Sequence, residues 1–122
     1  MSQPTPPLTG ACLCGAVQVT ISAPPLLTLV CHCDGCQKLT ASAFSLTTMV
    51  PSAGFACTGD LITGGLGTKG RQHFYCKSCL NFVFSKIEGA EHRVNLRTSV
   101  LDQAAAFPPF VGSVPAGGRM TP

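Results

Sequence analysis

Seven of the eight cysteines lie in three tight clusters, and their spacing limits what this chain can fold into more than any other feature. The clusters are Cys12-Leu13-Cys14, Cys31-His32-Cys33-Asp34-Gly35-Cys36 and Cys76-Lys77-Ser78-Cys79. Thiols one or two residues apart are poorly placed to bridge one another. A short turn can, however, direct two such sulfurs at one tetrahedral ion about 2.3 Å away. The spacing therefore predicts metal binding at turns.

Seven thiols are one too few for two closed four-sulfur sites, but they suffice for one closed site and one with an open position. A closed thiolate site is structural, whereas an open one can perform chemistry. The C-x-C and C-x-x-C pairs predict structural zinc at Cys12, Cys14, Cys76 and Cys79, with an iron centre or unliganded thiols as alternatives. Spacing alone does not establish which cluster pairs with which.

The middle cluster can form a three-thiolate face around a second, exchangeable zinc ion, with Cys31, Cys33 and Cys36 as ligands. Water, substrate or a further protein ligand would take the fourth position. The alternatives are an empty site or an inert one closed by His32, Asp34 or Cys57. His32 lies between two ligands, so its side chain is expected to point away from their metal.

Three other residues have simpler expected roles. Cys57 stands alone in an apolar segment, where a cysteine usually packs as a small hydrophobic side chain. His73 and His92 have no cysteine at ligand spacing, so we expect each to be a surface or strand residue.

Length and composition favour a single folded domain built mainly of strands. The chain has 122 residues, of which 45% are hydrophobic and 11% charged, and its 13 glycines and 10 prolines disfavour long helices. Residues 1–10 lack the pattern of a secretory signal, and no apolar run is long enough to span a membrane. We therefore expect a cytoplasmic protein in a reducing compartment, with no membrane partner.

The formal charge of +3 does not predict nucleic-acid binding. Seven thiolates on two zinc ions would bring the net charge to about zero. The basic residues are scattered, whereas nucleic-acid binding requires a basic stripe or patch. The residues concerned are Lys69, Arg71, Lys77, Lys86, Arg93 and Arg97.

Local patterns predict strands at residues 16–22, 44–50, 55–58, 73–75, 81–86 and 93–96, and a short helical turn at 34–40. The clearest signal is Val17, Val19 and Ile21 alternating with polar residues. We expect a flexible lead-in at residues 1–9, a zinc-binding domain at 10–102 and an irregular segment rich in proline and glycine at 103–122.

The order of the cysteines and their neighbours resembles the glutathione-dependent formaldehyde-activating enzyme (GFA) family, which also contains centromere protein V. The resemblance covers roughly residues 10–102. It rests on Gly10-Ala11-Cys12-Leu13-Cys14-Gly15-Ala16-Val17, Cys31-His32-Cys33-Asp34-Gly35-Cys36-Gln37-Lys38, Ala41-Ser42-Ala43-Phe44, Val50-Pro51, Phe55, Gly59, Phe74-Tyr75-Cys76-Lys77-Ser78-Cys79 and Leu101-Asp102.

The resemblance implies an all-β tent of small antiparallel sheets with little helix. It also implies a structural zinc at Cys12, Cys14, Cys76 and Cys79, and a catalytic zinc at Cys31, Cys33 and Cys36. The implied activity is that of a carbon–sulfur lyase that joins a small thiol such as glutathione to an aldehyde such as formaldehyde. The alternative is a zinc-stabilised binding module without turnover.

Two departures from the family pattern stand out. Leu80 follows the second C-x-x-C cysteine, where the family usually has a glycine that suits a left-handed turn. The histidine and tryptophan often found near the family's C-terminus are missing, which favours the binding-module alternative.

Overall fold

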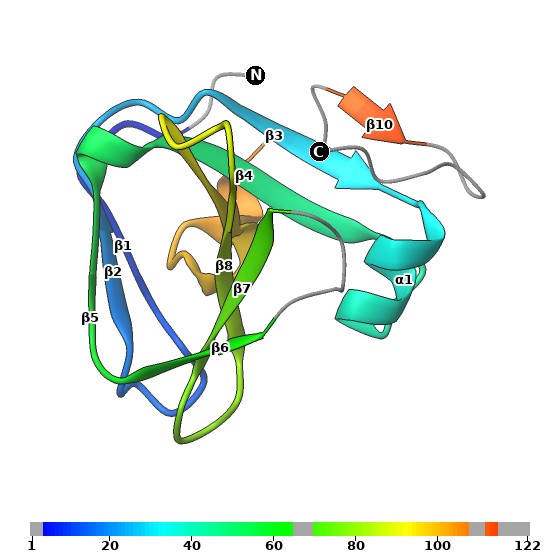
Figure 1. The fold of residues 1–122 in the computed structure, drawn as a ribbon. Helices are drawn as coiled ribbons and strands as arrows, with labels where there is room; N and C mark the ends of the chain where they lie inside the picture. The colour runs from blue at the N-terminus through cyan, green and yellow to red at the C-terminus, as the bar shows by residue number, and fades with distance from the viewer. Residues whose placement is uncertain (1–3, 65–69, 108–111, 115–122) are drawn as a thin grey trace.

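Two β-sheets pack around one hydrophobic core (Figure 1). The structure, a computed structural model, describes residues 4–64 and 70–107 and the backbone of residues 112–114. The smaller sheet has the strand order β1-β2-β5, with both pairs antiparallel. Its strands are β1 (Leu8–Ala11), β2 (Gln18–Ile21) and β5 (Phe55–Thr58).

The larger sheet has the strand order β10-β3-β4-β9-β8-β7-β6. Its pairs are antiparallel except that β10 runs parallel to β3. The strands are β3 (Leu27–Cys31), β4 (Ser45–Pro51), β6 (Leu61–Gly64), β7 (Arg71–Cys76), β8 (Phe82–Ile87), β9 (Arg93–Arg97) and β10 (Gly112–Val114).

Helix is scarce in the described part of the chain. The α-helix α1 (Asp34–Thr40) lies beside the ends of β3 and β4 (Figure 1), and it was predicted at the same residues. Three 3₁₀ turns accompany it: η1 (Ser52–Gly54), η2 (Thr98–Val100) and η3 (Ala104–Ala106). No described helix has the length and hydrophobicity needed to cross a bilayer. The prediction of an all-β fold with little helix is confirmed.

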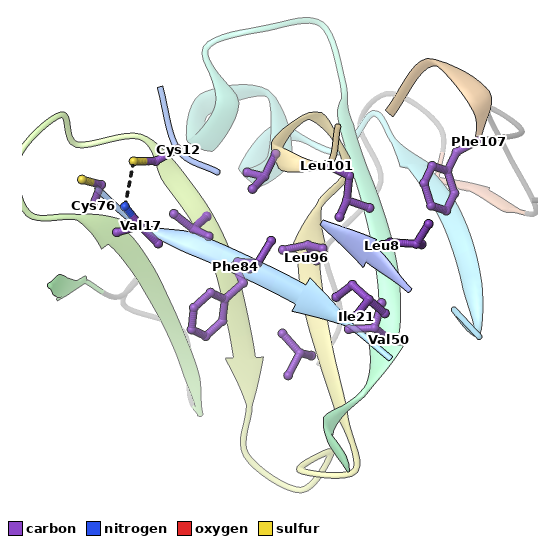
Figure 2. Packing of buried hydrophobic residues seen from close by; sticks show 14 residues of the cluster. Leu8, Cys12, Val17, Ile21, Val50, Cys76, Phe84, Leu96, Leu101 and Phe107 are labelled. Atoms are coloured by element: carbon purple, nitrogen blue, oxygen red, sulfur yellow. Dashed lines mark hydrogen bonds between the residues drawn. The ribbon is translucent and has the colours of Figure 1, made fainter. Parts of the chain in front are cut away.

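The core lies between the two sheets and follows the predicted alternation in β2. Val17, Val19 and Ile21 are at most 2% exposed, and they pack on Phe84 and Leu96 of the larger sheet. Figure 2 shows Val17, Ile21, Phe84 and Leu96 within this core, with Cys12 and Cys76 close together at one end of it. The first and third cysteine clusters therefore meet where the sheets join.

The sequence prediction missed four strands of the described part of the chain, β1, β3, β6 and β10. β1 includes Leu8 and Thr9 of the predicted lead-in, because Leu8 is 1% exposed and belongs to the core. β3, β6 and β10 were not predicted, and β10 lies in the segment expected to be irregular. The parallel β10–β3 pair also departs from the expected antiparallel pairing. These strands have three to five residues, too few to show a clear period.

Candidate metal centres and the adjoining cavity

The first candidate metal centre is built by two turns that lie far apart in the sequence. Cys12 and Cys14 follow β1, Cys76 is the last residue of β7, and Cys79 lies in the turn after it. The Sγ atoms of Cys12 and Cys14 are 3.6 Å apart, those of Cys14 and Cys76 are 3.8 Å apart, and all four lie within 4.8 Å of one another. A tetrahedron with metal–sulfur bonds of about 2.3 Å has an edge of about 3.8 Å. The four sulfurs therefore fit a single zinc ion.

Backbone hydrogen bonds fix the two turns of this four-cysteine cluster. The N–H of Val17 donates to Cys12 Sγ at 3.3 Å, and the N–H of Cys79 donates to Cys76 Sγ at 3.4 Å. Asn81 ties the turns together, because its Oδ1 accepts a hydrogen bond from the N–H of Leu13 at 2.9 Å. The structure thus pairs the first and third clusters, which spacing alone left open.

The second metal centre is a three-cysteine cluster at the start of α1. Cys31 ends β3, Cys33 caps the helix, and Cys36 lies in its first turn, so all three sulfurs converge within 4.8 Å. The thiols are at most 5% exposed. The N–H of Cys36 donates to Cys33 Sγ at 3.4 Å. A local segment of six residues therefore builds the whole cluster.

None of the alternative fourth ligands belongs to this three-cysteine group within the described residues. His32 turns its ring onto Phe44, with the ring centroids 5.6 Å apart, as its position between two ligands predicted. Asp34 is exposed. Cys57 lies in β5 of the other sheet and packs against the core, in agreement with the hydrophobic role expected for it.

The thiols within each cluster differ in how readily they lose a proton. Burial opposes ionisation of Cys12, but the N–H of Val17 and the neighbouring thiols outweigh it and lower its pKa to about 6. The N–H of Ala16 favours the Cys14 thiolate, yet the other thiols raise its pKa to about 11. In the second cluster, burial and two neighbouring thiols raise the pKa of Cys36 to about 12. A metal cation is what allows every thiol of such a set to lose its proton.

A cavity of about 180 Å³ adjoins the three-cysteine cluster. Cys31 and Cys36 line it together with Leu39 of α1. Most of its wall is the face of the larger sheet opposite the core, because its residues alternate along β4 and β9 with buried Val50, Val94 and Leu96. This wall combines apolar side chains with polar ones; the polar residues are Thr47, Arg71, His73, Ser85, Arg93, Asn95 and Arg97.

Arg97 is a buried cation of this wall. It is 9% exposed, its Nη1 donates to Thr47 Oγ1 at 2.9 Å, and its guanidinium carbon lies 5.0 Å from the centroid of the Phe82 ring. Burial lowers its pKa, and the thiolates of Cys36 and Cys31 act in the opposite direction. Arg97 therefore places a positive charge, held by a hydrogen bond, in the wall of the cavity that Cys31 and Cys36 also line.

His73 lies in β7, as expected of a strand residue, but it is only 2% exposed and lines the same cavity. Neither ring nitrogen has a hydrogen-bond partner among the described residues. Burial, followed by the charges of Arg71 and Arg97, lowers the pKa of His73. The imidazole is therefore neutral near pH 7.

Sequence reasoning did not connect His73 or Arg97 with the middle cysteines. The available signal was the period-two pattern of β9, which places Arg93, Asn95 and Arg97 on one face of the strand. In an antiparallel sheet, the polar face of such a strand is ordinarily solvated. In the structure, it forms a wall of the cavity.

The fold and the two clusters define a class of small β-sheet proteins with cysteine sites suited to metal ions. The chain belongs to the family described as glutathione-dependent formaldehyde-activating enzyme (GFA), whose model matches residues 7–113. A crystal structure of a Rhodobacter sphaeroides protein shares the fold, with a TM-score of 0.65 and 16% sequence identity. That similarity covers 87% of this chain and 99% of the other. A comparison with curated proteins gives no match.

Proposed function

We propose that this protein is a zinc-dependent carbon–sulfur lyase of the GFA type, which handles a small thiol such as glutathione and an aldehyde such as formaldehyde. The observation that carries the proposal is the convergence of three buried thiols, Cys31, Cys33 and Cys36, beside a cavity. No fourth protein ligand joins them within the described residues. A site of this kind keeps a position for a reactant.

The proposed roles of the two zinc ions differ. Cys12, Cys14, Cys76 and Cys79 would hold a structural ion, which is supported by their complete tetrahedral set and by their place at the junction of the sheets. Cys31, Cys33 and Cys36 would hold the catalytic ion. When bound there, zinc would supply a position at which a thiol loses its proton or a carbonyl is polarised.

In the proposed reaction, the sulfur of the thiol forms a bond to the aldehyde carbon. The carbonyl π electrons move to the oxygen, and that oxygen receives the proton released by the thiol. No other atom is gained or lost. The cavity walls would hold the two small reactants together, which converts a bimolecular encounter into an oriented one. Arg97, which lines the same cavity as Cys31 and Cys36, would stabilise negative charge on sulfur or oxygen.

The test compares the wild type, Cys36→Ser and Cys57→Ser, each with its zinc content measured. NMR follows the formation of S-hydroxymethylglutathione, and the spontaneous rate is subtracted. We expect wild type and Cys57→Ser to exceed the spontaneous rate about tenfold or more, and Cys36→Ser to fall to it. Cys57 is a matched control, because it is a partly buried cysteine outside both clusters. A wild type with two zinc ions and no acceleration would instead support the binding module without turnover.

A further inference from the structure

The cavity beside the three-cysteine cluster holds more positive charge and more unused hydrogen-bonding capacity than formaldehyde requires. A guanidinium group has five N–H donors. Within the described chain, Arg97 has one hydrogen bond, from Nη1 to Thr47 Oγ1. Burying a charged group is costly unless it is paired and hydrogen-bonded. The remaining donors of Arg97 are therefore available to a bound anion.

Other polar atoms around the cavity also have unused hydrogen-bonding capacity. Nε of Arg93, Oδ1 of Asn95 and both ring nitrogens of His73 are buried without a hydrogen-bond partner in the described part of the chain. Buried polar atoms are normally satisfied in native proteins. All three residues line the cavity together with Arg97. A polar ligand that occupied the cavity would satisfy several of these atoms at once.

The charge balance of the cavity favours an anion. No Asp or Glu is among the described residues that line it. A divalent metal would neutralise two of the three thiolate charges, so that Arg93 and Arg97 leave the enclosed space positive. The planar fork of an arginine matches a carboxylate, with which it forms two parallel hydrogen bonds.

Size and register limit the anion to a short molecule. The volume of about 180 Å³ is below the roughly 300–1,000 Å³ of drug-sized ligand sites. Arg97 of β9 pairs with Thr47 of β4, and Cys31 of β3 pairs with Ser45 of β4. The two partners on β4 are two residues apart. Two strand spacings and this two-residue step place the Cα atoms of Arg97 and Cys31 roughly 12 Å apart. Because both side chains line the cavity, a molecule of a few carbons can reach both.

We propose that this cavity is a carboxylate subsite. In this interpretation, Arg97 and Arg93 bind the carboxylate of a small acid whose other end, a thiol or an aldehyde, reacts at the three-cysteine cluster. The inference rests on the proposed function and narrows its substrate class to short thiol acids or aldehyde acids. A tripeptide thiol would leave most of its atoms outside the cavity.

The experiment measures binding by calorimetry to the zinc-loaded full-length protein, without turnover. The thiol arm compares 3-mercaptopropionate with neutral 3-mercapto-1-propanol, and the aldehyde arm compares glyoxylate with neutral glycolaldehyde. We expect the acid to bind at least about tenfold more tightly than its neutral partner in at least one arm. The arm that shows the preference identifies which reactant carries the carboxylate.

Three variants test which residues cause the tighter binding of the acid than of its neutral partner. Arg97→Lys keeps a positive charge but loses the planar fork. Arg93→Gln removes a positive charge at a half-buried position. Each should reduce the preference for the acid several-fold. Lys86→Gln should leave it unchanged, because this exposed lysine extends over the Phe74 and Phe84 rings and does not line this cavity.

The outcomes separate the subsite from the lyase. Equal binding of acid and neutral probes in both arms overturns the subsite but leaves the lyase proposal standing. A charge preference in binding, together with no acceleration in the S-hydroxymethylglutathione assay, supports the subsite and overturns the lyase. Failure of every probe to bind overturns the subsite, and the S-hydroxymethylglutathione assay then decides the lyase proposal by itself.

Discussion

Removal of the metal from the four-cysteine cluster should cost this domain a large part of its stability. The double substitution Cys14→Ser/Cys79→Ser takes one ligand from each turn and leaves two, which is too few for the four-coordinate site of a structural zinc ion. Cys14 is exposed and Cys79 is only half-buried, so the change disturbs little packing. The loss of stability then reports the cross-link rather than the core.

The magnitude follows from the length of chain that the metal closes. Cys14 and Cys76 are 62 positions apart. In the chain-entropy relation for cross-links, a loop of this length restricts the unfolded chain by about 4 kcal/mol. Domains of this kind are stable by about 5–15 kcal/mol. The double variant should therefore lose about a quarter or more of its free energy of unfolding, with Tm lowered by roughly 15 °C.

Urea denaturation followed by far-UV circular dichroism measures this effect, because the chain has no tryptophan and one tyrosine. The metal content of each sample is determined in parallel. Cys57→Ser is the control and should remain within about 1 kcal/mol of wild type. If the double variant loses its metal but still unfolds within about 1 kcal/mol of wild type, the metal does not act as a long-range cross-link.

Three further predictions concern single positions. Leu80 is exposed and has φ = 61°, so Leu80→Gly should raise the unfolding free energy by about 1 kcal/mol in urea melts; a loss would contradict the left-handed strain. A Cβ on Gly10 would lie 2.3 Å from the Val100 carbonyl oxygen, so Gly10→Ala should destabilise by about 1–3 kcal/mol; an unchanged Tm would refute that contact. The pKa of His73 is lowered from 6.5, so the folded state resists protonation of this residue. Wild type should therefore lose stability relative to His73→Asn as the pH falls below about 6.5. Parallel profiles of unfolding free energy against pH would show that His73 does not titrate this way.

The parts of the fold that were predictable from sequence are those with strong local patterns. Alternation in Val17, Val19 and Ile21 identified β2, and its apolar face is the one that is buried. β3 was missed because its burial inverts the usual pattern. Thr28 is 1% exposed and its Oγ1 lies 3.1 Å from Thr48 Oγ1, whereas Leu29 lines the cavity. A buried hydroxyl pair of this kind depends on the neighbouring strand, which a single segment does not reveal.

The candidate site divides in the same way. The three-cysteine cluster was predictable because one segment of six residues contains all its sulfurs, so local spacing encodes its geometry. The cavity was not, because Arg97, His73 and Cys36 come from β9, β7 and α1. Their proximity arises only when the larger sheet forms. Leu80 lies between these cases: the family comparison indicated a left-handed turn, and the backbone has one at this residue.

The two cysteine clusters contain the same kind of ligand in opposite settings, and the setting supports a different role for each. The four-cysteine cluster joins segments far apart in sequence and offers a metal a complete tetrahedral set, so its contribution lies in chain entropy. The three-cysteine cluster spans six residues, which makes it a weak cross-link, but it opens on a cavity with a buried arginine. If these roles are correct, ligand substitutions should separate in their effects. Changes in the first cluster should act on unfolding, and changes in the second should act on thiol binding.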